Sequence, residues 1–348
     1  MIAALVKVLV QLALLLLLAP LVSGLITTAK ARLQMRRGPG LLQTYREIHK
    51  LLRKDMVIPG TASWLFRATP YVVFLATLLA GLMVPIVAAD TPIGLFGGVL
   101  AVVYLLGFGR SFLAVGGLDT GSSFGGLGSS REMTIAALAE PTLMLAVFTV
   151  AIGAGSTTLA EMARAAIGQQ WRFLAPSQML AFAALFLVLI AETGRIPVDN
   201  PATHLELTMI HEAMILEYSG PYLALIEWAA SIRQLLLMTL LINVFGPFGL
   251  PQLMSPTGFL AGLGWLVAKL AMLSGGIVLV ETANAKMRLF RVPERDRTAS
   301  RWSAPSPGKR TRREDHAPLI VRDEFRPAIP RSGWSPPEPV SASPTRPG

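Results

Sequence analysis

The chain of 348 residues contains no cysteine. This absence excludes a disulfide framework, and it also excludes an iron–sulfur cluster or nickel site held by thiolates of this chain. Charged residues are scarce as well, at 15% of the sequence, and there are only four histidines. If the protein takes part in redox chemistry, its metals belong to other subunits. We therefore expect no catalytic residue, no metal ligand and no bound cofactor here.

Apolar residues are abundant instead: they make up 53% of the chain, and the mean hydropathy is +0.55. These values exceed ordinary globular usage and indicate an integral membrane protein. Because a membrane-spanning helix needs about 20 mainly apolar residues, we predict an all-α, polytopic transmembrane bundle within residues 1–294. Its seven predicted spans are 4–28, 68–89, 93–115, 133–154, 176–194, 219–245 and 257–281.

A signal peptide is the competing interpretation of the first run, since Lys7 precedes its leucines. The run is too long for the apolar region of a signal peptide, and a basic segment follows it where a cleavage site would have small residues. We interpret it as a retained span.

Basic residues are concentrated between the first two spans, in the segment 30–67. Inner loops of membrane proteins carry an excess of Lys and Arg, so this loop is predicted to be cytoplasmic. The N-terminus is then outside, and seven spans place the C-terminus in the cytoplasm, in a multi-pass protein of the cell inner membrane. Apolar residues among the charges of 41–54 predict a helix lying along the membrane surface. The basic residues are Lys30, Arg32, Arg36, Arg37, Arg46, Lys50, Arg53, Lys54 and Arg67.

A nucleic-acid partner is not expected despite the net charge of +10. The basic residues lie beside membrane spans, and no recognised nucleic-acid module is present. The expected contact is the lipid bilayer.

The stretch 191–220, AETGRIPVDNPATHLELTMIHEAMILEYSG, holds the densest set of ionisable groups between two spans. Charged groups near a bilayer are costly to bury, so such a set indicates a function. The alternative is a solvated amphipathic helix in a cytoplasmic loop, 192–218. The ionisable residues are Glu192, Arg195, Asp199, His204, Glu206, His211, Glu212 and Glu217.

The local pattern in this stretch predicts a helix that starts near Asn200. Asn200 before Pro201 is a typical helix start, with proline at the first helical position. Glu206 and Glu217 are eleven residues apart, and a continuous helix would place them about 20° from the same face. One face could then line a polar cavity.

Ionisable residues also lie inside predicted spans. Glu140 lies in the fourth span, Glu227 and Arg233 in the sixth, and Lys269 in the seventh. Such residues are functional candidates by default, and structural ion pairs are the alternative. Glu227 and Arg233 are six residues apart and do not share a helix face, so a direct pair between them is not expected.

The composition changes abruptly after residue 294. The segment 295–348 is rich in Arg, Pro and Ser and has no apolar span. Such a composition cannot form a packed core and predicts disorder. It is also typical of GC-rich coding sequence translated out of frame, and a frameshift is the interpretation that we favour.

The run from Gly194 to Gly220 carries a family resemblance. It is similar to the membrane subunit of formate hydrogenlyase and hydrogenase-4 type complexes. More distantly, it is similar to the quinone-site membrane subunit, subunit 1, of respiratory complex I. Three additional residues before the EYSG sequence, and His204 where the complex I pattern favours a carboxylate, both favour the hydrogenase branch. The matching residues are Arg195, Pro197, Asp199, Glu206, Glu217, Tyr218, Ser219 and Gly220.

The resemblance extends over residues 1–294 and has several implications. Glu140 and Lys269 match family positions, and the glycine-rich loop 116–132, a flexible cytoplasmic linker by composition, should be packed. The basic loop resembles the first cytoplasmic loop of the family, which contributes to the contact with the peripheral redox arm. The residues expected at this docking interface are Arg36, Arg37, Arg46, Lys50, Arg53 and Lys54.

The resemblance implies a membrane anchor and proton-coupling subunit of a membrane-bound [NiFe] hydrogenase or formate hydrogenlyase complex. Implied partners are the hydrogenase large and small subunits, a ferredoxin-like Fe–S subunit and antiporter-like membrane subunits, with the Fe–S clusters and the Ni–Fe site in those partners. The residues assigned to proton relay or coupling are Glu140, Glu192, Arg195, Asp199, His204, Glu206, His211, Glu212, Glu217, Glu227 and Lys269.

Three alternatives stay open. A quinone-site membrane subunit of NADH:quinone oxidoreductase would bind a quinone headgroup. A stand-alone proton-coupled transporter would show internal inverted repeats, and we see none. In a passive scaffold, the buried charges would be structural only.

Overall fold

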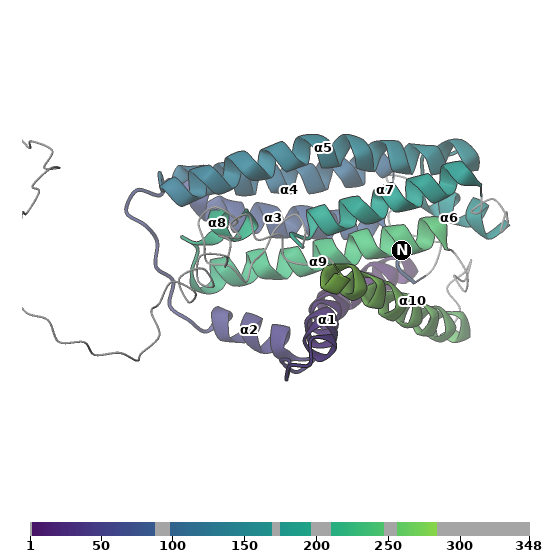
Figure 1. The fold of residues 1–348 in the computed structure, drawn as a ribbon, viewed down its shortest axis with the longest axis horizontal. Helices are drawn as coiled ribbons and strands as arrows, with labels where there is room; N and C mark the ends of the chain where they lie inside the picture. The colour runs from purple at the N-terminus through teal and green to yellow at the C-terminus, as the bar shows by residue number, and fades with distance from the viewer. Residues whose placement is uncertain (1, 88–97, 169–174, 196–209, 247–255, 284–348) are drawn as a thin grey trace, which may run out of the picture. The chain divides into compact units, whose positions relative to one another are not determined.

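The computed structural model describes residues 2–87, 98–168, 175–195, 210–246 and 256–283. The predicted tail 295–348 lies outside the described residues. The described part is helical, and it confirms the predicted all-α bundle (Figure 1). Its helices are α1 (Ile2–Leu33), α2 (Gln43–Leu52), α3 (Trp64–Met83), α4 (Val99–Asp119), α5 (Ser123–Ala154), α6 (Leu159–Gly168), α7 (Pro176–Glu192), α8 (His211–Ile215), α9 (Gly220–Phe245) and α10 (Pro256–Ala283).

Six of the described helices are long and apolar enough to cross a membrane: α1, α3, α4, α5, α9 and α10. The remaining predicted span, 176–194, is present as the apolar helix α7, which has 17 residues. At 1.5 Å per residue it is about 26 Å long, slightly less than the hydrocarbon thickness of about 30 Å. The chain is thus a multi-pass membrane protein.

Helix α9 runs through the middle of the bundle (Figure 1). It packs against α1, α2, α3 and α7, and every residue from 231 to 245 is buried. It is also the least apolar of the six candidate spans, with a mean hydropathy of 1.5, and it carries the buried polar residues Arg233, Gln234 and Asn243. Because polar side chains in a membrane bundle face its interior, these residues favour the central position of α9.

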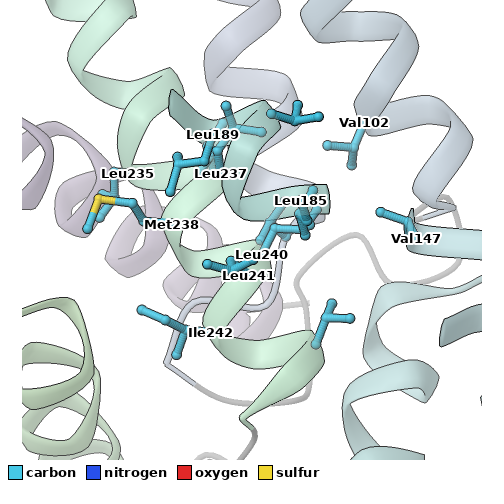
Figure 2. Packing of buried hydrophobic residues seen from close by; sticks show 14 of the residues in the cluster. Val102, Val147, Leu185, Leu189, Leu235, Leu237, Met238, Leu240, Leu241 and Ile242 are labelled. Atoms are coloured by element: carbon cyan, nitrogen blue, oxygen red, sulfur yellow. The ribbon is translucent and has the colours of Figure 1, made fainter. Parts of the chain in front are cut away.

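The apolar core joins α9 to α7, α4 and α5. Figure 2 shows Leu237 and Leu240 of α9 near Leu185 of α7, with Val102 of α4 and Val147 of α5 on the other side. Lipid tails are as apolar as these side chains, so van der Waals packing holds the helices together more than exclusion from water does. Close fit between helices is the main requirement of this core.

The glycine-rich segment 116–132 is not the loop that composition predicted. Helix α4 continues to Asp119 and α5 begins at Ser123, which leaves a connection of three residues. The Ser122 hydroxyl accepts a hydrogen bond of 3.1 Å from the Gly125 N–H and caps α5. Five of the predicted loop's six glycines therefore lie within helices, and only Gly121 lies in the connection.

These glycines allow close helix contact instead of flexibility. A Cβ on Gly125 would overlap the Gly117 carbonyl oxygen of α4, and a Cβ on Gly128 would lie 2.9 Å from Ala213 Cβ of α8. Small residues let helix backbones approach closely in membranes. The segment is thus packed, as the family resemblance implied.

Helix α2 confirms the helix predicted for 41–54, with Ile48 buried on its inner side. Two contacts attach its segment to α1. The Thr28 hydroxyl donates to the Pro39 carbonyl oxygen at 2.8 Å, and the Tyr45 hydroxyl donates to the Leu17 carbonyl oxygen. The basic residues of this loop therefore lie on a segment that is attached to α1.

Replacing Gly125 with Ala should destabilise the bundle by about 1–3 kcal/mol, because overpacking against a backbone carbonyl cannot be relieved by a side-chain movement. Gly126→Ala is the matched control, since the nearest atom to its added Cβ is Leu118 Cδ2 at 4.0 Å. Denaturation in mixed detergent micelles, followed by circular dichroism, measures the difference. Equal stability of the two variants would contradict the close contact of α4 and α5.

Candidate functional site

A buried arginine that the sequence analysis missed lies at the centre of the charged groups. Arg110 is on α4 and is 3% exposed. Its guanidinium donates to Glu192 at the end of α7 and, at 3.4 Å, to Glu140 of α5. Glu132, also on α5, lies 3.7 Å from Arg110 Nε. One cation is thus shared by three carboxylates from two helices.

A second ionic cluster joins α1, α9, α10 and the turn of residues 193–195 that follows α7. Arg195 Nη1 lies 2.8 Å from Glu281 Oε1 of α10, and Nη2 donates to Gln234 Oε1 of α9 at 3.1 Å. Lys30 Nζ of α1 lies 2.6 Å from the other oxygen of Glu281. Glu281, which is 4% exposed, therefore receives two cations.

The sequence AETGR explains how α7 presents both clusters. Gly194 has φ +57, the left-handed conformation that glycine adopts without strain. The Arg195 N–H donates to Ile190 O at 3.1 Å and the Gly194 N–H donates to Ala191 O at 3.2 Å, which is a Schellman motif. The turn leaves Glu192 facing Arg110 and directs Arg195 to Glu281.

A cavity of about 310 Å³ lies between the two clusters. It is bounded by α1, α5, the end of α7, α8, α9 and α10. Its volume is comparable to that of small ligand sites, and its walls carry more negative than positive groups. The charged and ionisable residues of the wall are Lys30, Glu132, Glu192, Arg195, His211, Glu212, Glu227, Arg233 and Glu281.

Arg233 of α9 is the most enclosed cation of this wall. It is 5% exposed, and its Nε has no hydrogen-bond partner among the described residues. No ion pair joins it to Glu227 in the described part of the chain, as the spacing of six residues predicted. A buried cation beside an acidic cavity stabilises negative charge there.

The cavity brings together five of the eleven residues predicted for relay or coupling: Glu192, Arg195, His211, Glu212 and Glu227. Glu140 is connected to it through Arg110. These groups come from the 191–220 stretch and from two spans, and they stay candidates for proton transfer because their environment can shift their protonation.

Of the other five predicted residues, Lys269 and Glu217 are not among the described residues of the cavity wall. Asp199, His204 and Glu206 lie outside the described residues. Lys269 donates to the Gly246 carbonyl oxygen at 2.6 Å, so it caps the C-terminal end of α9. Glu217 lies beyond the end of α8.

The expected helix does not continue to Glu217, and its predicted start near Asn200 lies outside the described residues. Helix α8 begins at His211 and ends at Ile215. Leu216 and Glu217 form a turn that leads to α9, in which the Tyr218 N–H donates to Ile215 O. Glu217 therefore lies in a turn outside α8, and this turn leads to Tyr218, which is buried.

Two sequence signals could have identified the missed residues. Arg110 is the only charged residue of the predicted span 93–115, which is the same signal that selected Glu140. Glu281 lies at the end of the last predicted span, where only its tertiary partners reveal that it is buried. Glu132 follows Arg131 at the end of the predicted loop 116–132, where charged residues are ordinary, so the sequence does not indicate that it belongs to a site.

The comparisons with known proteins agree with the helical architecture. A family model described as NADH dehydrogenase matches residues 6–294. Formate hydrogenlyase subunit 4 of Escherichia coli K12 is 35% identical over 285 residues, 82% of this chain and 92% of that protein. Hydrogenase-4 component C of the same organism is 34% identical over 285 residues, 82% of this chain and 89% of that protein.

A subunit of NADH-quinone oxidoreductase from Rubrobacter xylanophilus is 31% identical over 208 residues, 57% of this chain and 61% of that protein. A chain in the structure of the membrane-bound sulfane sulfur reductase, an archaeal respiratory membrane complex, has a TM-score of 0.72 and 20% identity. That match covers 86% of this chain and 94% of the other, and it shows a shared fold. The family model and the aligned relatives confirm the resemblance seen in the sequence, and this protein belongs to the NADH dehydrogenase family.

Proposed function

We propose that this chain is the membrane anchor and proton-coupling subunit of a membrane-bound [NiFe] hydrogenase or formate hydrogenlyase complex. The observation that carries the proposal is the cavity wall of ionisable groups inside a bundle of membrane helices. The relatives that align over most of both chains, formate hydrogenlyase subunit 4 and hydrogenase-4 component C, support the same assignment.

In this proposal, the chemistry of H⁺ reduction occurs in partner subunits that carry the Ni–Fe site and the Fe–S clusters. The partners are the hydrogenase large and small subunits, a ferredoxin-like subunit and antiporter-like membrane subunits. This chain holds the peripheral subunits at the cytoplasmic face. A redox event near the cavity changes the protonation of its glutamates, since neighbouring charge shifts the pKa of a carboxyl group.

The second candidate is the quinone-site membrane subunit of NADH:quinone oxidoreductase. The similarity to the NADH-quinone oxidoreductase subunit from Rubrobacter xylanophilus favours it, but that match spans 208 residues against 285 for the hydrogenase relatives. The longer alignments at higher identity favour the hydrogenase assignment.

Glu227→Gln should assemble normally and produce H₂, but proton movement should fall at least about tenfold, because a neutral amide cannot transfer a proton. Glu227 lines the cavity. Proton movement in sealed vesicles, measured together with H₂ production by the assembled complex, tests this. Glu161→Gln on α6 is the matched control at the other end of the bundle (Figure 1). Wild-type proton movement in Glu227→Gln would count against a relay through the cavity.

Reversing the charge of Arg36 and Arg37 together, with Glu at both positions, should release the hydrogenase subunits from washed membranes. Both arginines are exposed between α1 and α2. Exposed ion pairs are screened by salt, so wild-type membranes should also lose these subunits gradually as ionic strength rises. Arg164→Glu on α6 is the control. If the double variant keeps its partners at high salt, the docking surface lies elsewhere.

The proposed orientation places the N-terminus outside and residues 34–63 in the cytoplasm of a cell with this protein in its inner membrane. Because the chain has no cysteine, a single introduced cysteine reports its own side of the membrane. Thr157→Cys, between α5 and α6, should react with an impermeant maleimide in intact cells. Gln34→Cys should react only after lysis. The reverse pattern would invert the topology and place α2 outside.

A further inference from the structure

The sequence EYSG at 217–220 contacts a segment that is distant in the sequence, residues 54–57. The Ser219 hydroxyl accepts a hydrogen bond from the Val57 N–H and donates one to the Val57 carbonyl oxygen, both at 2.9 Å. One side chain thus satisfies both backbone groups of a residue 162 positions earlier. These two bonds attach the segment after α2 to the start of α9.

Gly220 makes the same connection by direct backbone packing. Its φ is +55, which L side chains rarely adopt, and an added Cβ would lie 3.0 Å from the carbonyl oxygens of Lys54 and Asp55. A side chain here would strain the backbone and separate the two segments. Glycine is therefore required where α9 begins.

Tyr218, which precedes Ser219, attaches the same turn to α3. Its ring stacks on Phe66 of α3, with the ring centroids 4.0 Å apart and the planes 3° from parallel. Burial raises the pKa of the Tyr218 hydroxyl well above its usual range, so the ring stays neutral in the core. Phe66 is fully buried, and its N–H donates to Asp119 at the end of α4.

These contacts connect the proposed docking surface to the cavity. We define the docking segment as residues 34–58, which includes α2. Its beginning is attached to α1 through Thr28 and Pro39, and its end is attached to α9 through Val57 and Ser219. Helix α1 supplies Lys30 to the cavity wall, and α9 supplies Glu227, Arg233 and Gln234.

The distance along α9 is short enough for a rigid connection. Glu227 lies seven residues after Gly220, which is two helix turns or about 10 Å. Gly220 and Glu227 belong to one uninterrupted helix, in which Tyr222, Ala224 and Ile226 are buried against its neighbours. We therefore expect a displacement of the docking segment to move the start of α9 and, with it, Glu227 in the cavity wall.

We propose that Ser219 and Gly220 are positioning residues that link the docking segment to α9 and so set the geometry of the charged cavity. This role rests on the proposed function, because it requires a partner at the docking segment and proton movement through the cavity. Loss of the link should uncouple proton movement from H₂ production while the partner subunits remain attached.

Ser219→Ala removes both hydrogen bonds to Val57, whereas Ser219→Thr keeps the hydroxyl. In the complete complex, the number of protons moved per H₂ should fall about threefold or more in Ser219→Ala and should be restored in Ser219→Thr. Gly220→Ala should reproduce the fall through strain at φ +55. Ser111→Ala is the control, since its hydroxyl donates to the Gly107 carbonyl oxygen of the same helix.

The two possible failures give different results. If wild-type complex moves protons and Ser219→Ala keeps the wild-type ratio at equal subunit content, the positioning role is overturned and the proposed function stands. A fall in Ser219→Ala that Ser219→Thr does not restore also overturns it. If wild-type complex produces H₂ without moving protons, the proposed coupling function fails, and the positioning role fails with it.

Discussion

The structure depends on charge compensation inside an apolar bundle. Arg110 is buried, and a buried cation without a partner would be strongly unfavourable. Its three glutamates come from α5 and α7, so the ion pairs of Arg110 connect α4 to both of these helices. Arg110 and Glu192 are both buried, and removing Arg110 would leave the Glu192 carboxylate without its cation, a change that costs about 3–5 kcal/mol in buried pairs. Function and stability are thus linked through the same side chains.

Helix α9 is held at both of its ends by hydrogen bonds to other parts of the bundle. At one end Ser219 and Gly220 attach it to the docking segment, and at the other Lys269 donates to the Gly246 carbonyl oxygen. Because α9 ends here, no further helical turn supplies an N–H to the Gly246 carbonyl oxygen, and the amine of Lys269 donates to it instead. A backbone carbonyl without a hydrogen bond is costly in a membrane. Lys269 therefore has a structural explanation that its sequence position did not suggest. Between these ends, Arg233 faces the cavity from the most buried part of the helix.

Much of the architecture was predictable because helix formation in membranes is a local property. Apolar run length located all seven predicted spans. Six of them are helices long enough to cross a membrane, and the seventh is the shorter apolar helix α7. The basic, partly apolar pattern located α2. Composition failed at 116–132, because glycine serves two opposite purposes: it loosens a linker in water and tightens helix contacts in a membrane. A glycine-rich composition alone does not distinguish a flexible linker from a close helix contact.

The sequence by itself determined the seven apolar spans, the helix within 41–54 and the family to which the chain belongs. Only the tertiary structure decided which charges meet. Glu140 and Glu192 are 30 and 82 residues from Arg110, and Glu281 is 86 residues from Arg195. Helix periodicity relates residues three or four positions apart, so it contains no information on pairs at such separations. The packing of α5 on α4 and α7, and of α9 on α1, α7 and α10, brings those pairs together and forms the cavity between them.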